Sequence, residues 1–291
     1  MRYRHMRFPG GLLKAATFSY DDGIKADIRL SDIFTKYGAK ATFNLNREDA
    51  RGERGITVDE VNEHILGKGH EVAIHGYMHR AAGLLTATEG ICEYLDSRRD
   101  LEKTYGRIIR GMAYPDSGVN RFNGYCDYSD VKDYLSKLGI VYARTTIQKG
   151  NDFELPLDFH RWDSNAHHNN ENIFEYIDEF IAYEAKNRYY PTVTPKLLYI
   201  WGHSYEFDNN DNWDRIEKIC EKLAAAREQI WFATNIEIYD YVMAYRSLVF
   251  SADSKIVYNP TLLPIWFEVD LVSYCIEPGQ TLIIEEPKPA I

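Results

Sequence analysis

The chain has 291 residues, of which 45% are hydrophobic and 27% charged, an ordinary globular composition with ample material for a core. Its formal net charge is −10 and no local run of Lys and Arg offsets it, so neither a nucleic acid nor an anionic membrane surface is an expected partner. No stretch reaches the roughly 18 apolar residues that a membrane span needs. This balance favours a globular protein with a neutral or cationic ligand.

The N-terminal segment 1–8 is basic but no apolar run follows it, so it lacks the pattern of a secretory signal and we expect a cytoplasmic protein. The four cysteines are dispersed and form no C-x-x-C pair, which favours reduced structural thiols. The 22 tyrosines and 5 tryptophans fit either a carbohydrate site or half-buried barrel positions.

Strand-like and helical segments alternate along most of the chain. Strands are predicted at residues 14–19, 40–45, 70–75, 109–114, 140–145, 196–202 and 231–234. Helices are predicted at residues 25–37, 57 to about 67, 86–105, 130–138, 171–187, 212–227 and 236–246. An order of about seven or eight β-then-α units predicts an α/β fold with a parallel sheet, which a closed barrel accommodates best.

The pattern changes at about Leu248. Residues 248–291 alternate or run apolar between N-P, L-P and P-G turn signals, which predicts three or four short antiparallel strands. We therefore expect a barrel domain over residues 1–247 and a small β appendage over residues 248–291.

The segment TFSYDDG, residues 17–23, ends the first predicted strand. Adjacent carboxylates point in different directions where a strand runs into a loop, so Asp22 can bind a metal ion while Asp21 faces a substrate. Gly23 allows the chain to turn sharply there. Alone the triplet is a weak signal, since most such triplets are solvated turns.

His75 and His79 follow the third predicted strand. Two imidazoles four residues apart lie on one face of a helical turn, a common spacing for a metal pair. Unrelated surface histidines are the alternative, which their position at the end of a barrel strand disfavours. With Asp22 they form an open metal site, and the combination is stronger than either motif alone.

The stretches TFSYDDG and GHEVAIHGYMH, at 17–23 and 69–79, resemble the motifs of the polysaccharide deacetylases with a NodB homology domain, carbohydrate esterase family 4. The resemblance covers roughly residues 14–245 and implies a distorted (β/α)7-8 barrel of the NodB type. Looser matches follow in chain order: RGMAYP at 110–115, RWD at 161–163 and LYIWGH at 198–203.

The resemblance implies a metal-dependent hydrolase that removes acetyl groups from a carbohydrate, at nitrogen or oxygen. Asp22, His75 and His79 would ligate one divalent ion, expected to be zinc, with cobalt, nickel, manganese or iron as alternatives. Asp21 would be the general base for a metal-bound water. Arg110 would pair with Asp21 and keep it ionised.

The later motifs would supply the acid and the oxyanion contact. His203 would protonate the leaving amine or alcohol, and Asp163 would orient His203, with Asp158 as its rival in the alignment. The backbone N–H of Tyr114 would stabilise the oxyanion together with the metal.

Aromatic residues near these motifs are candidates for substrate contacts. Trp201 could stack on a sugar or merely close the barrel end, and Tyr114 and Trp162 are expected to line the same site.

Two further features have no counterpart in the family motifs. His167 and His168 are either exposed loop histidines, substrate contacts or an extra metal ligand. Residues 205–208, directly after His203, form either part of the site rim or a plain loop.

Three other functions compete with deacetylation. A glycosidase with two carboxylates would leave His75 and His79 unexplained. A non-catalytic carbohydrate-binding module and a hydrolase of a non-sugar amide remain alternatives. The expected partner is an acetylated carbohydrate, with a homo-oligomer as a possible assembly.

Overall fold

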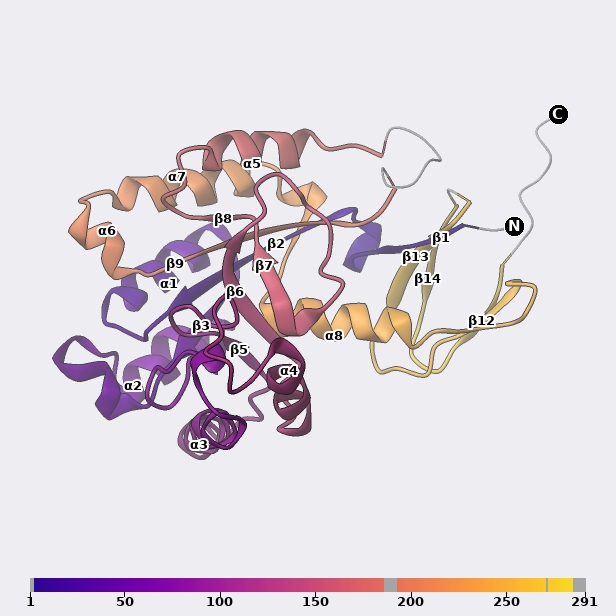
Figure 1. Ribbon diagram of the computed structural model, residues 1–291. Helices are drawn as coiled ribbons and strands as arrows, with labels where there is room; N and C mark the ends of the chain where they lie inside the picture. Colours follow the sequence, from indigo (N-terminus) through magenta and orange to yellow (C-terminus); the bar gives the residue numbers. More distant parts are fainter. Residues whose placement is uncertain (1–2, 186–192, 271, 285–291) are drawn as a thin grey trace.

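A computed structural model describes residues 3–185, 193–270 and 272–284, and its centre is a parallel sheet (Figure 1). The strands run in the order β7-β6-β5-β4-β3-β2-β9-β8, with β10 beside β2. Their bounds are β2 Lys14–Asp21, β3 Ala41–Leu45, β4 Glu71–Ile74, β5 Gly111–Ala113, β6 Tyr142–Gln148, β7 Trp162–Ser164, β8 Ala166–His167, β9 Lys196–Gly202 and β10 Ile230–Phe232.

The two ends of this sheet meet in one short segment of chain. Trp162 pairs with Arg144 in β6, and His167, five residues later, pairs with Trp201 in β9. Residues 162–167 therefore join the first and last strands, and the sheet curves into a distorted barrel. The predicted (β/α)7-8 fold is confirmed, and the strand that completes it, β7 with β8, was absent from the predicted set.

Helices cover the outside of the sheet, as the alternation predicts (Figure 1). Their bounds are α1 Ala26–Tyr37, α2 Val58–Glu60, α3 Ala87–Tyr105, α4 Tyr128–Lys137, α5 Ile173–Ala182, α6 Tyr205–Asn209, α7 Trp213–Ala224 and α8 Asn235–Arg246. The predicted box at Thr57 is present, because its hydroxyl accepts from the Glu60 N–H and the Glu60 carboxylate accepts from the Thr57 N–H. The helix then continues as a π-helical turn over Val61–Ile65. Residues 186–187 of the predicted fifth helix lie outside the described residues.

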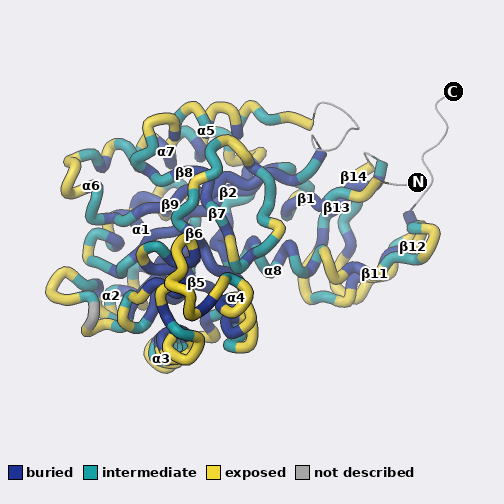
Figure 2. Tube along the Cα trace, viewed as in Figure 1, coloured by how far each residue is buried: buried dark blue, intermediate teal, exposed yellow. Residues whose placement is uncertain are grey.

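The core forms on both sides of the strands. All eight residues of β2 and all seven of β9 are buried (Figure 2). One hydrophobic cluster fills the space between sheet and helices, and a second joins the barrel to the C-terminal strands through residues such as Tyr199, Tyr241 and Phe267. Continuous apolar runs are typical of parallel strands with both faces covered.

The C-terminal segment forms antiparallel strands, as predicted, but its described residues form five strands instead of three or four, and the N-terminal strand β1 pairs with one of them. The strands are β11 Val249–Phe250, β12 Ile256–Tyr258, β13 Ile265–Val269, β14 Val272–Ile276 and β15 Thr281–Ile283. Strand β1, Arg4–Arg7, pairs with β13, and Arg7 Nη2 lies 2.6 Å from Glu268 Oε2 in a buried ion pair. The sequence pattern did not place residues 4–7 in this unit, because pairing between distant segments leaves no local signal. Residues 285–291 of the predicted appendage lie outside the described residues.

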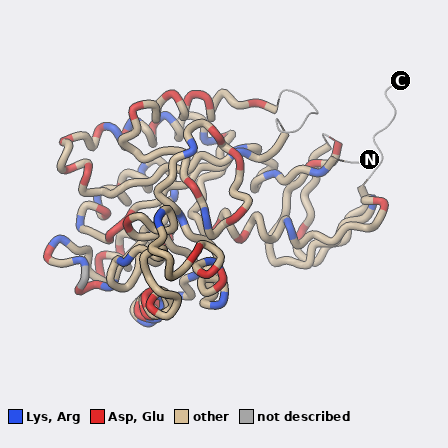
Figure 3. The backbone as a smooth tube through the Cα atoms, in the orientation of Figure 1, with Lys and Arg blue, Asp and Glu red and all other residues tan. Residues whose placement is uncertain are grey.

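Charged residues of both signs are interspersed over the described elements (Figure 3). Within the same residues, no helix has both the length and the apolar character that crossing a membrane requires.

Candidate active site

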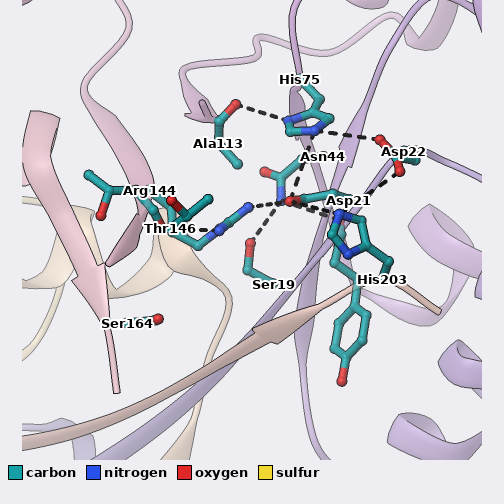
Figure 4. Close-up of polar contacts among 12 residues, drawn as sticks. Ser19, Asp21, Asp22, Asn44, His75, Ala113, Arg144, Thr146, Ser164 and His203 are labelled. Carbon is teal, nitrogen blue, oxygen red and sulfur yellow. Dashed lines mark hydrogen bonds and ion pairs between the residues drawn. The ribbon is translucent and has the colours of Figure 1, made fainter. Parts of the chain in front are cut away.

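The three predicted metal ligands lie close together after the carboxyl ends of their strands. Figure 4 shows Asp22 and His75 at this site. Asp22 follows β2, whereas His75 and His79 follow β4. Asp22 Oδ1 lies 3.5 Å from His75 Nε2 and 3.6 Å from His79 Nε2. One ligand atom from each residue lies within 4.8 Å of the others, a spacing that suits a single ion.

The backbone at two of these ligands lies in the left-handed region, with φ of 80° at Asp22 and 56° at His79. Such conformations are uncommon for residues other than glycine and cluster at functional sites. The ring of His75 is oriented by its Nδ1, which lies 3.0 Å from the carbonyl oxygen of Ala113. Burial lowers the pKa of His75. Because Nδ1 donates to the carbonyl oxygen, the lone pair of the neutral ring is on Nε2, the atom that faces Asp22. The donor set therefore fits a divalent ion such as zinc.

Asp21 is buried beside this site and carries two strong hydrogen bonds (Figure 4). Asn44 Nδ2 donates to Asp21 Oδ1 at 2.8 Å, and the guanidinium of Arg144 donates to Asp21 Oδ2. Burial alone would raise the pKa of Asp21, but Arg144, followed by His75 and His203, lowers it below its usual value. The carboxylate is therefore ionised and directed, as a proton acceptor must be.

The expected pairing of Arg110 with Asp21 is wrong. Arg110 precedes β5, at the amino-terminal end of the barrel, and its Nη2 lies 2.6 Å from Asp240 Oδ2 in α8. Catalytic groups lie at the other end of the strands. Arg144, within β6, takes the place assigned to Arg110.

His203 follows β9 and faces the same centre, with Nε2 4.0 Å from both Asp21 Oδ2 and Asp22 Oδ2. Its Nδ1 lies 3.4 Å from Glu206 Oε1. Burial would lower the pKa of His203, but Glu206, Asp21 and Asp22 raise it above its usual value. The protonated ring is therefore favoured, which suits a proton donor.

Neither rival aspartate reaches His203. Asp163 accepts a hydrogen bond from the Thr145 hydroxyl. Asp158 caps a short turn by accepting from the His160 N–H at 3.0 Å, and it also pairs with Lys132 at 2.7 Å. The expected role of Asp163 is thus corrected: Glu206, three residues after His203 in α6, is the carboxylate at this imidazole.

Tyr114 is not available for the expected oxyanion and substrate contacts. Its backbone N–H donates to the Arg144 carbonyl oxygen at 2.9 Å, and its hydroxyl donates to the His160 carbonyl oxygen at 2.9 Å. The side chain is fully buried. The Tyr114 N–H thus extends the hydrogen bonding between β5 and β6, so it is not free to donate to an oxyanion.

The two expected substrate-stacking tryptophans are also buried. Trp162 packs edge-to-face on Tyr142 and Phe159, inside the core cluster that joins the barrel to the C-terminal strands. Trp201 is 8% exposed, with the Arg144 guanidinium carbon 4.3 Å from its ring centroid. Trp201 therefore packs against the Arg144 guanidinium and exposes little surface for contact with a sugar.

His167 and His168 lie beside Glu206. Their Nε2 atoms are 3.0 Å and 3.1 Å from Glu206 Oε2. His168 is fully buried between the rings of Tyr20 and Phe207, and burial lowers its pKa to about 4. His168 is thus a neutral interior group, which corrects its expected role as a substrate contact, whereas His167 lies at the partly exposed edge of the site.

The sequence reasoning missed Asn44 and Arg144, and it left Glu206, within residues 205–208, as either part of the site rim or a plain loop. Arg144 had a usable signal, because an arginine within an otherwise apolar predicted strand must find a buried partner. Asn44 in the second predicted strand had the same signal. Glu206 had none beyond its nearness to His203.

The family model for polysaccharide deacetylases matches residues 4–142, which include Asp21, Asp22, His75 and His79. A search among curated proteins gave no match.

Solved structures share the fold at low sequence identity. A proposed polysaccharide deacetylase from Mycobacterium smegmatis matches with a TM-score of 0.53 at 15% identity, over 83% of this chain and 94% of that chain. Puue allantoinase matches with a TM-score of 0.54 at 14% identity, over 80% of this chain and 91% of that chain. The Streptococcus pyogenes deacetylase PplD, solved with acetate, is 21% identical with a TM-score of 0.39, and this match spans 45% of this chain and 55% of that chain.

The first two structures confirm the barrel architecture, and the family model matches the part of the barrel that carries the candidate metal ligands. Residues 4–142, which contain the motifs at 17–23 and 69–79, are thus similar to polysaccharide deacetylases, and the solved structures share the fold of the chain.

Proposed function

We propose that this protein is a metal-dependent hydrolase that removes acetyl groups from a carbohydrate. One observation carries the proposal: the Asp21 carboxylate and the His203 imidazole lie 4.0 Å apart, and each lies within 4.0 Å of a member of the Asp22, His75 and His79 cluster. A base, an acid and a metal site within a few ångströms of one another are the groups that acyl hydrolysis needs.

When bound, a divalent ion would be held by Asp22, His75 and His79 and would polarise the acetyl carbonyl and acidify a water molecule. Asp21 accepts the proton of that water as oxygen adds to the acetyl carbon. Arg144 and Asn44 keep the Asp21 carboxylate charged and directed during this transfer.

His203 completes the reaction by donating its Nε2 proton to the leaving nitrogen or oxygen as the acyl bond breaks. Acetate and a free amine or alcohol are then released, and the proton held by Asp21 replaces the one that His203 has lost. The same groups serve an N-acetyl and an O-acetyl substrate, because both need one base and one acid.

Acetate release from a panel of acetylated compounds tests this function. The panel pairs N-acetylglucosamine oligomers with O-acetylated xylo-oligosaccharides and adds small non-sugar acetamides. Chelator-stripped protein is assayed with and without Zn²⁺ or Co²⁺, and Asp21→Asn is the matched inactive variant.

Metal-restored release from a sugar, lost in Asp21→Asn, is the expected result. Release only from the non-sugar acetamides would show that the substrate is a non-sugar amide and not a carbohydrate. Binding of the oligosaccharides without any release would favour a carbohydrate-binding module.

A further inference from the structure

The carboxylate of Glu206 lies at the centre of three imidazoles, from His167, His168 and His203. Its Oε2 faces the two neighbouring histidines, and its Oε1 faces His203 Nδ1. Burial would raise the pKa of Glu206, but the three imidazoles lower it far below its usual value. A single charged group therefore connects the rim segment 167–168 to His203.

This cluster has the composition of a second metal site, since His167, His203 and Glu206 each offer a ligand atom within 4.8 Å of the others. The ring orientation of His167 argues against that reading. Its Nδ1 accepts the backbone N–H of Asn169 at 3.2 Å, which leaves Nε2 as the donor nitrogen of the ring. His167 therefore faces Glu206 as a donor, and a donor cannot give that lone pair to a metal.

We propose that Glu206 is the positioning residue of His203, and that His167 and His168 hold Glu206 in the orientation that His203 requires. His168 is suited to this because it is 0% exposed and clamped between two rings, with ring centroids 5.6 Å away at Tyr20 and 4.1 Å away at Phe207. The carboxylate oxygen Oε1 lies 3.4 Å from His203 Nδ1, and this contact orients the ring so that Nε2 faces Asp21 and Asp22.

The start of helix α6 also fixes the position of Glu206 relative to His203. Ser204, next to His203, donates a hydrogen bond of 2.6 Å to the buried Asp27, which anchors the start of this turn. Glu206 follows in the first turn of α6, at the i+3 position from His203. Glu206 Oε1 contacts His203 within the same stretch of chain, and His167 and His168, at the end of β8 and just after it, contact the other oxygen, Oε2.

The proposal rests on the proposed function, and two assays separate their failures. The first compares an acetamide or alkyl acetate with an activated aryl acetate, in wild type, Glu206→Gln and His167→Gln. An aryloxide leaves without protonation, so loss of an oriented acid reduces kcat only for the poorer leaving groups. We expect Glu206→Gln to lose on the order of 10²-fold in kcat on the acetamide, with KM and aryl acetate turnover close to wild type. His167→Gln is expected to lose less in the same direction.

Two matched variants control for nonspecific effects. Asp208→Asn makes the same carboxylate-to-amide change on the same helix, where Asp208 accepts from the Trp213 indole at 2.8 Å. Asp163→Asn removes the carboxylate that contacts Thr145. Neither is expected to change the ratio of the two activities. Equal losses on both substrates in Glu206→Gln would overturn the positioning role.

The second assay needs no activity. A proton on His203 Nδ1 hydrogen-bonded to a carboxylate gives a low-field ¹H resonance, assigned by its loss in His203→Gln. We expect this signal to disappear in Glu206→Gln and to persist in Asp163→Asn. Persistence in Glu206→Gln, or binding of two Zn²⁺ equivalents with one lost in His167→Gln, would contradict the proposal. A wild type that shows the signal but releases no acetate would refute the proposed function alone.

Discussion

Arg144 and Asp21 form a buried ion pair between β6 and β2, with side chains that are 0% and 2% exposed. These strands are separated by β3, β4 and β5 in the sheet, and neighbouring strands lie about 4.8 Å apart, so an open sheet would hold them roughly 19 Å apart. The contact therefore exists because the sheet closes into a barrel.

Because Arg144 forms this buried pair, we expect its substitution to affect stability and activity more than substitution of Arg110. Arg144→Gln leaves a buried carboxylate uncompensated, which costs about 3–5 kcal/mol of unfolding free energy. It also raises the pKa of Asp21 and lowers acetate release at neutral pH. Arg110→Gln breaks a half-exposed pair with Asp240 and costs about 1 kcal/mol or less. Urea unfolding and acetate assays of both variants provide the measurement, and similar losses in the two would contradict the assignment.

Metal binding is expected to stabilise the fold through Asp22, His75 and His79. At a metal concentration 100 times the Kd, the gain in unfolding free energy is about 2.7 kcal/mol. Thermal unfolding of the stripped protein with added Zn²⁺ should show this gain in wild type and lose it in Asp22→Asn. His64→Gln, on a surface histidine away from the site, is the control that should retain it. An equal gain in Asp22→Asn would show that the ion binds elsewhere.

The raised pKa of Asp27 predicts that the protein loses stability as the pH rises. Burial raises this pKa from an ordinary 3.8 to about 7, although Ser204 and the Ile24 N–H stabilise the charged form. The folded state therefore holds a proton that the unfolded state has lost. Stability is fully present below pH 4 and falls through pH 7 by about 1.4 kcal/mol per pH unit.

The Asp27→Asn variant tests this directly, since its amide can serve both hydrogen-bond partners. Relative to wild type, it should gain about 2–3 kcal/mol between pH 5 and pH 8 in urea unfolding. A constant difference between the two proteins over this range would show that Asp27 does not titrate there.

Trp162 is expected to affect stability and not substrate affinity. Trp162→Ala removes an indole buried against Tyr142, Phe159 and Tyr199, which costs about 3–5 kcal/mol. Trp162→Phe should keep the KM of wild type. Leu157→Ala, at a side chain that is 98% exposed, should change stability by less than about 0.5 kcal/mol. A raised KM in Trp162→Phe would restore the substrate contact that the sequence predicted.

Local sequence patterns were enough to predict most of the strand and helix order, the barrel class and the grouping of Asp22, His75 and His79. These features are local: apolar runs, the capping box at Thr57, and side chains placed just after β2 and β4. Parallel strands present their carboxyl ends at one edge, so Asp22, His75 and His79 could be brought together by reasoning alone.

The charged partners of Asp21 and His203, by contrast, became clear only from the folded structure. Arg110 and Arg144 both lie near predicted strands, but one is at the amino-terminal end of β5 and the other within β6, and barrel closure brings only Arg144 to Asp21. Asp163 and Glu206 differ in the same way, because the orientation of each side chain depends on the packing of β7, β8 and α6. A motif specifies which residue types are present, whereas a pairing across the barrel depends on how the whole sheet curves.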